Sequence, residues 1–337
     1  MKLNFQANET NIVIQAEFAI NGVFNPSTFA NVGQLIYSVN GKQCMILDSF
    51  ASVTNMLESA VQSPGTEAPI FSGLPYIRMV DQDATYQATS ITLPHRLASG
   101  YLLKNKSAML GTERFDKKIV AEFKQLGFHA TVLKYCPMSL LHGVWFSQLE
   151  GGHHKISKSV SGNLVAEGVT VAVAGGVSMD NVRKQSANLD TSYFDRDGNK
   201  EAKPSELGIG MIPHSTKRYA CDRVIGNFYI NFGQIDSYKI PQSGKTLLKA
   251  LGIYEVYHFL AKVPMHRSDC VMSLKTADAN IDIQLNGTVI KDLDQAYAAV
   301  ETAIEQCKTE KVLGSPIEVT VTLKDTEAKK DSKAKKD

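Results

Sequence analysis

Apolar and polar residues in the first part of the chain follow strand-like patterns broken by glycine turns. Residues 11–24, NIVIQAEFAINGVF, are rich in β-branched and aromatic side chains, and Asn21-Gly22 predicts a turn within them. Residues 33–48, GQLIYSVNGKQCMILD, predict a hairpin with its turn at Asn40-Gly41, because this dipeptide accepts the positive φ of a tight hairpin turn. The chain therefore begins with β structure.

Two segments show the spacing of amphipathic helices. In residues 49–62, SFASVTNMLESAVQ, the apolar residues fall on one face of a helix; they are Phe50, Val53, Met56, Leu57 and Val61. Ser63-Pro64-Gly65 follows and predicts the end of this helix. Residues 116–126 predict a second helix, which is closed by Gly127.

The centre of the chain is less regular, whereas its C-terminal part is regular again. Residues 150–158 and 188–206 are polar and aperiodic, which indicates functional loops or partly disordered segments. Residues 280–287, 293–309 and 316–323 predict a strand, a helix and a strand. Such a β-α-β unit is half of a ferredoxin-like or RRM-type layer, so the predicted fold class is α+β.

The predicted organisation is a scaffold built from both ends of the chain around an inserted region. We expect an RRM-like or ferredoxin-like palm from residues 1–90 and 224–323. Residues 91–223 are then a large, basic, loop-rich finger or thumb insertion. Residues 324–337 have no apolar face, and this predicts a disordered charged tail.

One apolar run carries charge in its middle. Residues 91–103, ITLPHRLASGYLL, resemble a strand that is interrupted by Pro94, His95 and Arg96. Because proline lacks the N–H that a central strand needs, we expect a strand end here, with the imidazole and guanidinium turned outward. A second interpretation places Arg96 in a buried network with Asp48 or Glu58.

The composition is that of a globular, cytoplasmic protein. Hydrophobic residues make up 43% and charged residues 21% of the 337 residues. The apolar runs are too short to span a bilayer, and the N-terminus lacks the apolar core of a signal peptide. The five cysteines form no CxxC pair, which suits a reducing compartment and disfavours a zinc knuckle or ribbon.

Positive charge is concentrated in the middle of the chain, although the net charge is only +2. Residues 95–160 hold ten lysines and arginines, four carboxylates and five of the eight histidines. Such a block is either a solvated, lysine-rich face or an anion-binding lobe within a neutral scaffold.

Motifs for nucleotide hydrolysis, metal binding and hydrolase catalysis are incomplete. The sequence SGKT at residues 243–246 resembles the end of a P-loop, but the glycine required five residues before Gly244 is replaced by Lys239. We therefore expect a turn that leads into a helix. His153-His154 has no third ligand at metal spacing, and residues 195–199 lack the rest of a calcium loop. We predict no cofactor, no metal and no catalytic residue.

Cationic and hydroxyl side chains near turns form the better candidate site. Lys and Arg supply charge to phosphates, and hydroxyls and imidazoles add hydrogen bonds. Nearby aromatic residues of the kind that stack on bases are Tyr101, Tyr193, Phe194 and Tyr219. We expect the cationic clusters to line one channel for ribose-phosphate. The predicted RNA-binding residues are Ser49, Ser52, Asn55, His95, Arg96, Ser99, Lys104, Lys106, Lys155, Lys158, Arg183, Lys184, His214, Lys217, Arg218 and Arg223.

Four segments, in their order along the chain, resemble a known family. They are LDSFASVTNMLESA, SITLPHRLASGYLL, MSLLHGVWFSQ and IPHSTKRYACDRVIGNFYINFG. Together they resemble the Cas-seven family of RAMP proteins, the RNA-binding backbone subunits of type I CRISPR Cascade complexes. The nearest resemblance is to the Csb-one-like and minimal variant type I-F subgroup.

The resemblance implies a non-catalytic subunit that polymerises as a helical filament along CRISPR RNA and supports recognition of target DNA. It implies further copies of the chain as partners, and other Cascade subunits such as a capping subunit at the guide 5′ end and a guide-processing endoribonuclease. No membrane is implied. Such a subunit binds any spacer, so it should contact phosphates and 2′-hydroxyls and not base edges.

The resemblance also assigns places to several segments. It makes residues 151–158 and 174–184 candidate thumb or finger tips, and it places His95-Arg96 at the finger base. The family helix usually carries Ser-x-x-Ser followed by basic residues. Here Ser49 and Ser52 are kept, but Val53, Thr54 and Asn55 follow, so phosphate contacts would come from hydroxyls and Asn55.

Two other functions stay open. A RAMP-type endoribonuclease would process CRISPR RNA with a histidine such as His95, His142 or His214. A structural protein would self-associate without nucleic acid.

Overall fold

The structure is a computed structural model, and it describes residues 4–7, 10–29, 31–64, 68–149, 152–173, 177–179, 211–213, 217–262, 265–267, 270–275 and 283–323. The strands are β1 (Asn4–Ala7), β2 (Asn11–Ile20), β3 (Ile36–Val39), β4 (Lys42–Asp48), β5 (Ile77–Val80), β6 (Tyr86–Thr89), β7 (Met109–Leu110), β8 (Glu113–Arg114), β9 (Val144–Leu149), β10 (Gly152–Ile156), β11 (Val160–Glu167), β12 (Thr170–Val173), β13 (Val177–Met179), β14 (Met211–Pro213), β15 (Lys217–Ala220), β16 (Arg223–Asn231), β17 (Met265–Arg267), β18 (Cys270–Leu274), β19 (Ile283–Leu285), β20 (Thr288–Ile290) and β21 (Ile317–Thr320). The helices are α1 (Phe50–Ser59), the 3-10 helix η1 (Arg96–Ala98), α2 (Gly100–Leu103), α3 (Phe115–Leu126), α4 (Phe128–Tyr135), α5 (Pro137–Leu141), α6 (Phe232–Ser237), α7 (Gln242–Lys262) and α8 (Leu293–Thr309). Helices and strands are mixed along the chain, which confirms the α+β class.

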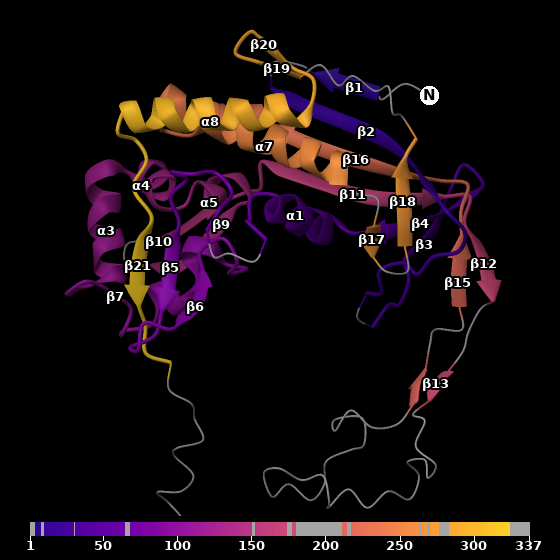
Figure 1. The fold of residues 1–337 in the computed structure, drawn as a ribbon, viewed down its shortest axis with the longest axis horizontal. Helices are drawn as coiled ribbons and strands as arrows, with labels where there is room; N and C mark the ends of the chain where they lie inside the picture. Colours follow the sequence, from indigo (N-terminus) through magenta and orange to yellow (C-terminus); the bar gives the residue numbers. More distant parts are fainter. Residues whose placement is uncertain are drawn as a thin grey trace, which may run out of the picture.

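A sheet of eight strands occupies the centre of the molecule (Figure 1). Its order is β17-β18-β2-β16-β11-β4-β3, and β1 also pairs with β2. Alternate residues of β2 are buried, because successive side chains of a strand point to opposite faces; they are Ile12, Ile14, Ala16 and Phe18. One face of this sheet therefore forms the main core.

Helices α1 and α7 cover that buried face. A Cβ atom on Gly162 of β11 would lie 3.0 Å from Val53 of α1, and one on Gly252 of α7 would lie 2.8 Å from Val160. Val160 and Gly162 point to the same face because they are two residues apart. The missing side chains at both glycines let the helices approach the sheet closely. Helix α8 packs along α7 (Figure 1).

The C-terminal strand joins a second, five-stranded sheet ordered β6-β5-β21-β7-β8. Strand β21 runs parallel to β5, and this sheet lies with α2 to α5 at one end of the large sheet (Figure 1). The predicted strand, helix and strand all form, but β19 pairs with β20 instead of lying beside β21. The prediction that these elements share one β-α-β layer is therefore wrong. Contacts with residues far away in the sequence select the partner of each strand, and local periodicity does not report such contacts.

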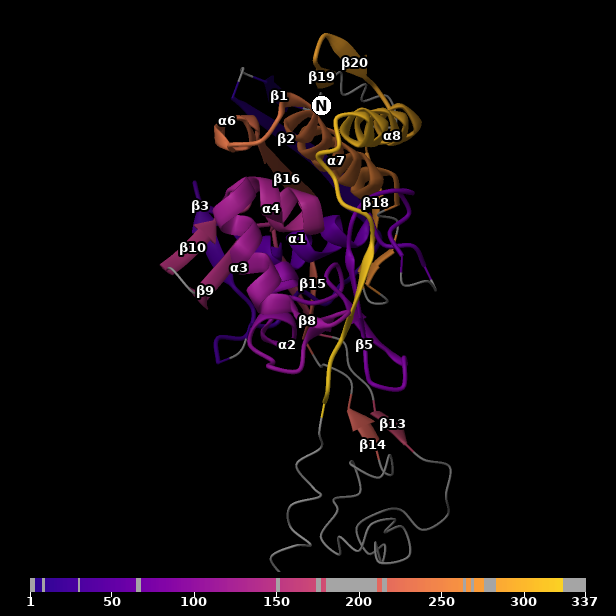
Figure 2. The same cartoon turned by 90° about the vertical axis from the view of Figure 1, so that its left-hand side faces the viewer.

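Residues 91–223, which were predicted as an insertion, contribute a strand to the large sheet. Strand β11 from this region lies between β16 and β4 in the large sheet. Strands β12 and β15 continue β11 and β16 as a two-stranded ribbon, and β13 and β14 lie farther along it (Figures 1 and 2). The predicted boundary thus cuts through the central sheet, and the predicted tail at 324–337 lies outside the described residues.

Several local predictions are confirmed. The turn between β3 and β4 has φ of 50° at Asn40 and 77° at Gly41, as a tight hairpin turn requires. Helix α1 lies within the predicted range, and α3 ends at Gly127, where φ is 85°. Among the described residues, no helix is both long enough and apolar enough to cross a membrane.

Three local predictions are wrong. Residues 91–103 form turns, η1 and α2 in place of a strand. Ser243 and Gly244 lie inside the first turn of α7 and not in a turn before it. Residues 152–156 form strand β10, paired with β9, where a loop was expected.

Candidate nucleic-acid interface

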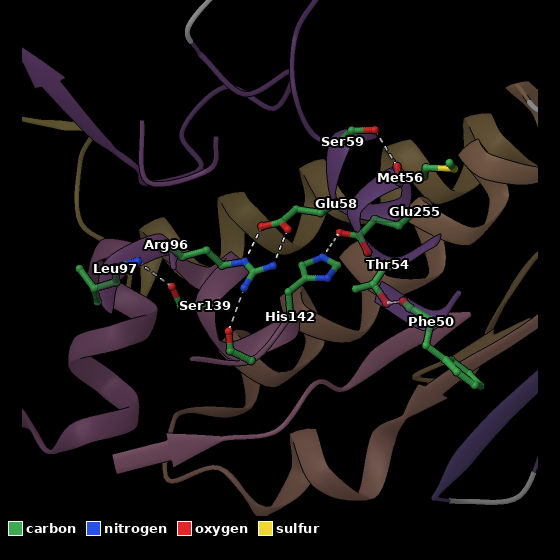
Figure 3. A network of polar contacts seen from close by, with 11 residues as sticks. Phe50, Thr54, Met56, Glu58, Ser59, Arg96, Leu97, Ser139, His142 and Glu255 are labelled. Carbon is green, nitrogen blue, oxygen red and sulfur yellow. Dashed lines mark hydrogen bonds and ion pairs between the residues drawn. The ribbon is translucent and has the colours of Figure 1, made fainter. Parts of the chain in front are cut away.

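Arg96 is held inside the protein by an ion pair with α1. Its side chain is buried, and Nε and Nη2 each donate to a carboxylate oxygen of Glu58 at 2.5 Å (Figure 3). Its Nη1 donates to the carbonyl oxygen of Gly143 at 3.1 Å. The expectation of an outward guanidinium is therefore wrong, and the buried network with Glu58 is the interpretation that the geometry supports.

A second buried polar pair lies beside the first. His142, at the end of α5, has Nε2 2.8 Å from Oε1 of Glu255 on α7, and both side chains are fully buried (Figure 3). Burial lowers the pKa of His142 to about 4, and burial raises the pKa of Glu255 well above its usual value. The pair therefore carries no net charge near neutral pH, and one proton lies between imidazole and carboxyl.

These two pairs connect four elements, and Arg96 and His142 form the floor of a pocket. Glu58 belongs to α1, Arg96 to η1, His142 follows α5 and Glu255 belongs to α7. The backbone N–H of Leu97 also donates to Ser139 Oγ at 3.3 Å, which joins η1 to α5 (Figure 3). Buried and hydrogen-bonded polar groups of this kind fix geometry, because removing one leaves its partner buried and unpaired.

A pocket of about 390 Å³ opens above this floor. It lies between η1 and the β9–β10 pair, and its lining residues are Pro94, His95, Arg96, His142, Gly143, Val144, Trp145, Lys155, Ile156, Ser157 and Lys158. The lining contains no carboxylate side chain. Within the described residues, neither Lys155 nor Lys158 has a carboxylate within 4.0 Å, the limit for an ion pair.

Positive charge is crowded in this pocket. Burial, and then repulsion from Arg96, lower the pKa of Lys158. His95 and Lys155 are both exposed at the pocket rim. An anion placed here would gain from two ammonium groups and meet no carboxylate in the lining, so the pocket suits a phosphate.

The outer face of β9–β10 adds an exposed aromatic ring. Trp145 pairs directly with Lys155 across the two strands, so both side chains lie on the same face. The indole is 62% exposed, whereas its neighbours Val144 and Phe146 point to the other face and are buried. Lys104 reaches the same strand, with Nζ 3.3 Å from Ser147 Oγ. We call Lys104, Trp145, Ser147 and Lys155 the outer face.

The pocket and the outer face unite some of the predicted RNA-binding residues. His95, Arg96, Lys155 and Lys158 line the pocket, and Lys104 adjoins it through β9. Several other predicted residues do not line the pocket; they are Ser49, Ser52, Asn55, Ser99 and Lys106. Ser49 caps α1 by accepting from the N–H of Ser52 at 3.2 Å, and Ser99 is buried and caps α2.

The remaining predicted residues lie elsewhere. Lys217 and Arg218 belong to β15 of the ribbon, at the opposite end of the large sheet from β9 (Figure 1). Arg223 donates from Nε to Oε2 of Glu167 at 2.7 Å, and its Nη1 lies 3.5 Å from Oε2 of Glu17. Carboxylates of the same chain therefore neutralise its charge. The expectation of one channel that includes Arg96 and Arg223 is thus wrong. Arg183, Lys184 and His214 lie outside the described residues, as do Tyr193, Phe194 and the side chain of Lys217.

Sequence reasoning missed Trp145 as a candidate ligand contact. Tyr219, which it singled out, is buried at 3% exposure and packs against Phe24. The signal for Trp145 was the alternation in VWFS, where Val144 and Phe146 take the apolar face and leave the indole beside Ser147. This is the only tryptophan of the chain.

Comparison with protein families gives a match over residues 12–171 to "CRISPR-associated protein GSU0053 (Cas_GSU0053)". The match covers slightly less than half of the chain, and it contains Glu58, η1, the pocket lining and the outer face. It supports a relation to CRISPR-associated proteins for this part of the chain.

Other comparisons add less. The curated proteins contain no match. Among solved structures, a chain of "CRISPR RNA-guided surveillance complex, pre-nicking" has a TM-score of 0.40 and 10% identity, over 92% of this chain and 96% of that chain. A score at this level defines neither a shared fold nor a shared function.

Proposed function

We propose that the chain is a non-catalytic subunit that binds CRISPR RNA and forms the backbone of a type I Cascade complex. One observation supports this above the others: Lys155, Lys158 and His95 converge on a pocket whose lining contains no carboxylate. The pocket lies within the segment that matches a CRISPR-associated family. The same proposal includes further copies of the chain, target DNA, a capping subunit and a guide-processing endoribonuclease as partners.

The physical basis is recognition of the RNA backbone. Lysines that neutralise phosphates contribute affinity that does not depend on base sequence, which suits a subunit that must bind any guide. The two buried pairs hold α1, η1, α5 and α7 together, so the floor of the pocket needs no rearrangement when RNA binds. Arg96 contributes mainly to this floor, because Glu58 already neutralises its charge.

The test is binding of labelled CRISPR RNA to the purified chain as the salt concentration rises. We expect an intact RNA in a complex with several copies, and an affinity that falls with salt. Each substitution, Lys155→Ala or Lys158→Ala, should reduce the salt slope by about 0.7. Lys291→Ala is the matched control, because Lys291 is an exposed lysine between β20 and α8. Equal slopes for all three variants would refute the proposed phosphate site.

The same assay separates the two alternatives. An endoribonuclease would cut the RNA at discrete sites, and this cleavage would disappear in His95→Ala. Among the candidate histidines, His142 is fully buried and bonded to Glu255, which leaves it without access to RNA. A purely structural protein would assemble equally well after nuclease treatment, with no absorbance from co-purifying nucleic acid.

A further inference from the structure

We infer that Trp145 is a stacking platform for one base of single-stranded RNA, and that the adjoining phosphate occupies the pocket beside it. This inference rests on the proposed function and adds the mode of binding. It uses three features: the exposure of the indole, its register with Lys155, and the lining of the pocket by both residues.

The exposure of Trp145 is not explained by packing within the chain. An indole is the largest apolar side chain, and leaving 62% of it in water forgoes much of the stabilisation that its burial would give. The neighbours Val144 and Phe146 fill the core side of β9. The strand register thus turns the ring outward and places it next to the cationic side chain of Lys155. An exposed aromatic ring beside a cation is typical of a ligand contact.

The surroundings of Trp145 match the two ends of a nucleotide. Its cross-strand neighbour Lys155 and the nearby Lys158 supply charge, and the pocket between them and η1 has no carboxylate. A base and its own phosphate are covalently joined, so a ring next to an anion pocket suits a nucleotide better than a free anion. Stacking on an aromatic ring accepts every base, which is compatible with binding of any guide.

The chain offers a direct probe, because its single tryptophan is the residue in question. The experiment follows indole fluorescence of the full chain during titration with oligouridylate, while anisotropy of a labelled oligouridylate measures binding independently. Inorganic polyphosphate serves as a polyanion without bases. We expect oligouridylate to quench the indole and to shield it from acrylamide, and we expect polyphosphate to bind without either effect.

The outcomes separate this inference from the proposed function. Binding of oligouridylate with unchanged indole emission and unchanged acrylamide access overturns the stacking platform, while RNA binding itself stands. No binding of RNA overturns both. Shielding that depends on protein concentration in the absence of RNA assigns Trp145 to a contact between copies and also overturns the platform. Stronger quenching by oligothymidylate than by oligouridylate assigns the platform to DNA and refutes the choice of RNA.

Variants supply the second measurement. Trp145→Ala should weaken RNA binding by about 5- to 150-fold, since stacking on one ring contributes roughly 1–3 kcal/mol. Trp145→Phe should retain most of the affinity because it keeps an aromatic face. Tyr37→Ala is the control, because Tyr37 is an aromatic residue on the edge strand β3 and is 39% exposed. Equal affinities for the three variants, each with an unchanged melting temperature, would overturn the inference.

Discussion

Arg96 shows that the environment of a charged residue decides its role more than its type does. In the sequence, its place after Pro94 suggests exposure at a strand end. In the structure, it has a φ of 47° in η1 and its guanidinium forms a bidentate pair with Glu58, 38 residues earlier. Loss of either partner would leave a buried, uncompensated charge.

We expect Glu58→Ala and Arg96→Ala each to lower the free energy of unfolding by about 3–5 kcal/mol, because each leaves the other charge buried without a partner. The double substitution Arg96→Met with Glu58→Leu should recover most of this loss. Urea unfolding followed by circular dichroism measures all three. If Arg96→Ala keeps normal stability and only weakens RNA binding, the buried pair is not what holds Arg96 in place.

The His142–Glu255 pair predicts a pH dependence of stability. The folded pair keeps one proton, because the pKa of His142 is lowered to about 4 and that of Glu255 is raised. In the unfolded chain, His and Glu have pKa values near 6.5 and 4.3. Between pH 4.3 and pH 6.5 the unfolded pair therefore also holds one proton. Above pH 6.5 the unfolded pair loses its proton and the folded pair keeps it, so stability falls as the pH rises.

The expected slope is about 1.4 kcal/mol per pH unit above pH 6.5, until the pKa of Glu255 in the folded protein is passed. Glu255→Gln should remove this contribution, because the amide still bonds His142 and does not titrate. Urea midpoints of both proteins between neutral and mildly alkaline pH provide the measurement. If the urea midpoints of the wild type and the variant change with pH in the same way, Glu255 is ionised in the folded protein.

At the scale of elements, the start of α1 connects stability with the candidate interface. Ser49 is the N-cap, with its Oγ accepting from Ser52 N, and the hydroxyl hydrogen can still be donated to a phosphate. The cap function and the predicted RNA contact are therefore compatible in geometry, and substitutions can separate them.

Ser49→Ala should lower the free energy of unfolding by about 1 kcal/mol, the usual loss for a serine N-cap. Ser49→Asp should keep the stability, because aspartate also caps helices, but it places a negative charge at the predicted phosphate contact. Unfolding curves and RNA affinities of both variants are compared. An RNA affinity of Ser49→Asp equal to that of the wild type would remove Ser49 from the interface.

Elements set by local chemistry could be predicted from the sequence, and elements set by distant partners could not. The turn at Asn40-Gly41 and the end of α3 at Gly127 follow from φ preferences of one or two residues. The place of β11 between β16 and β4, and the pairing of β21 with β5, depend on side chains far away in the sequence. For the site, the sequence identified individual charged residues such as Lys155 and Lys158. It did not predict that β10 and η1 lie close together and form the pocket.

At the scale of the whole molecule, two of the predicted RNA-binding groups lie far apart. One group, with Lys155 and Lys158, lies at the pocket, and the other, with Lys217 and Arg218, lies on the ribbon at the far end of the large sheet (Figure 1). An RNA that follows the chain from one end to the other would contact both groups, whereas an RNA confined to the pocket would not.

We expect both groups to contribute to RNA binding independently, because they lie at opposite ends of the large sheet and distant substitutions act additively. The pair Lys155→Ala with Lys158→Ala, and the pair Lys217→Ala with Arg218→Ala, should each reduce the salt slope by about 1.4, and the fourfold variant by about 2.8. Affinities measured over a salt series provide these slopes, with Lys291→Ala as the neutral control. A ribbon pair that behaves like the control would confine the RNA to the pocket end of the molecule, at β9–β10.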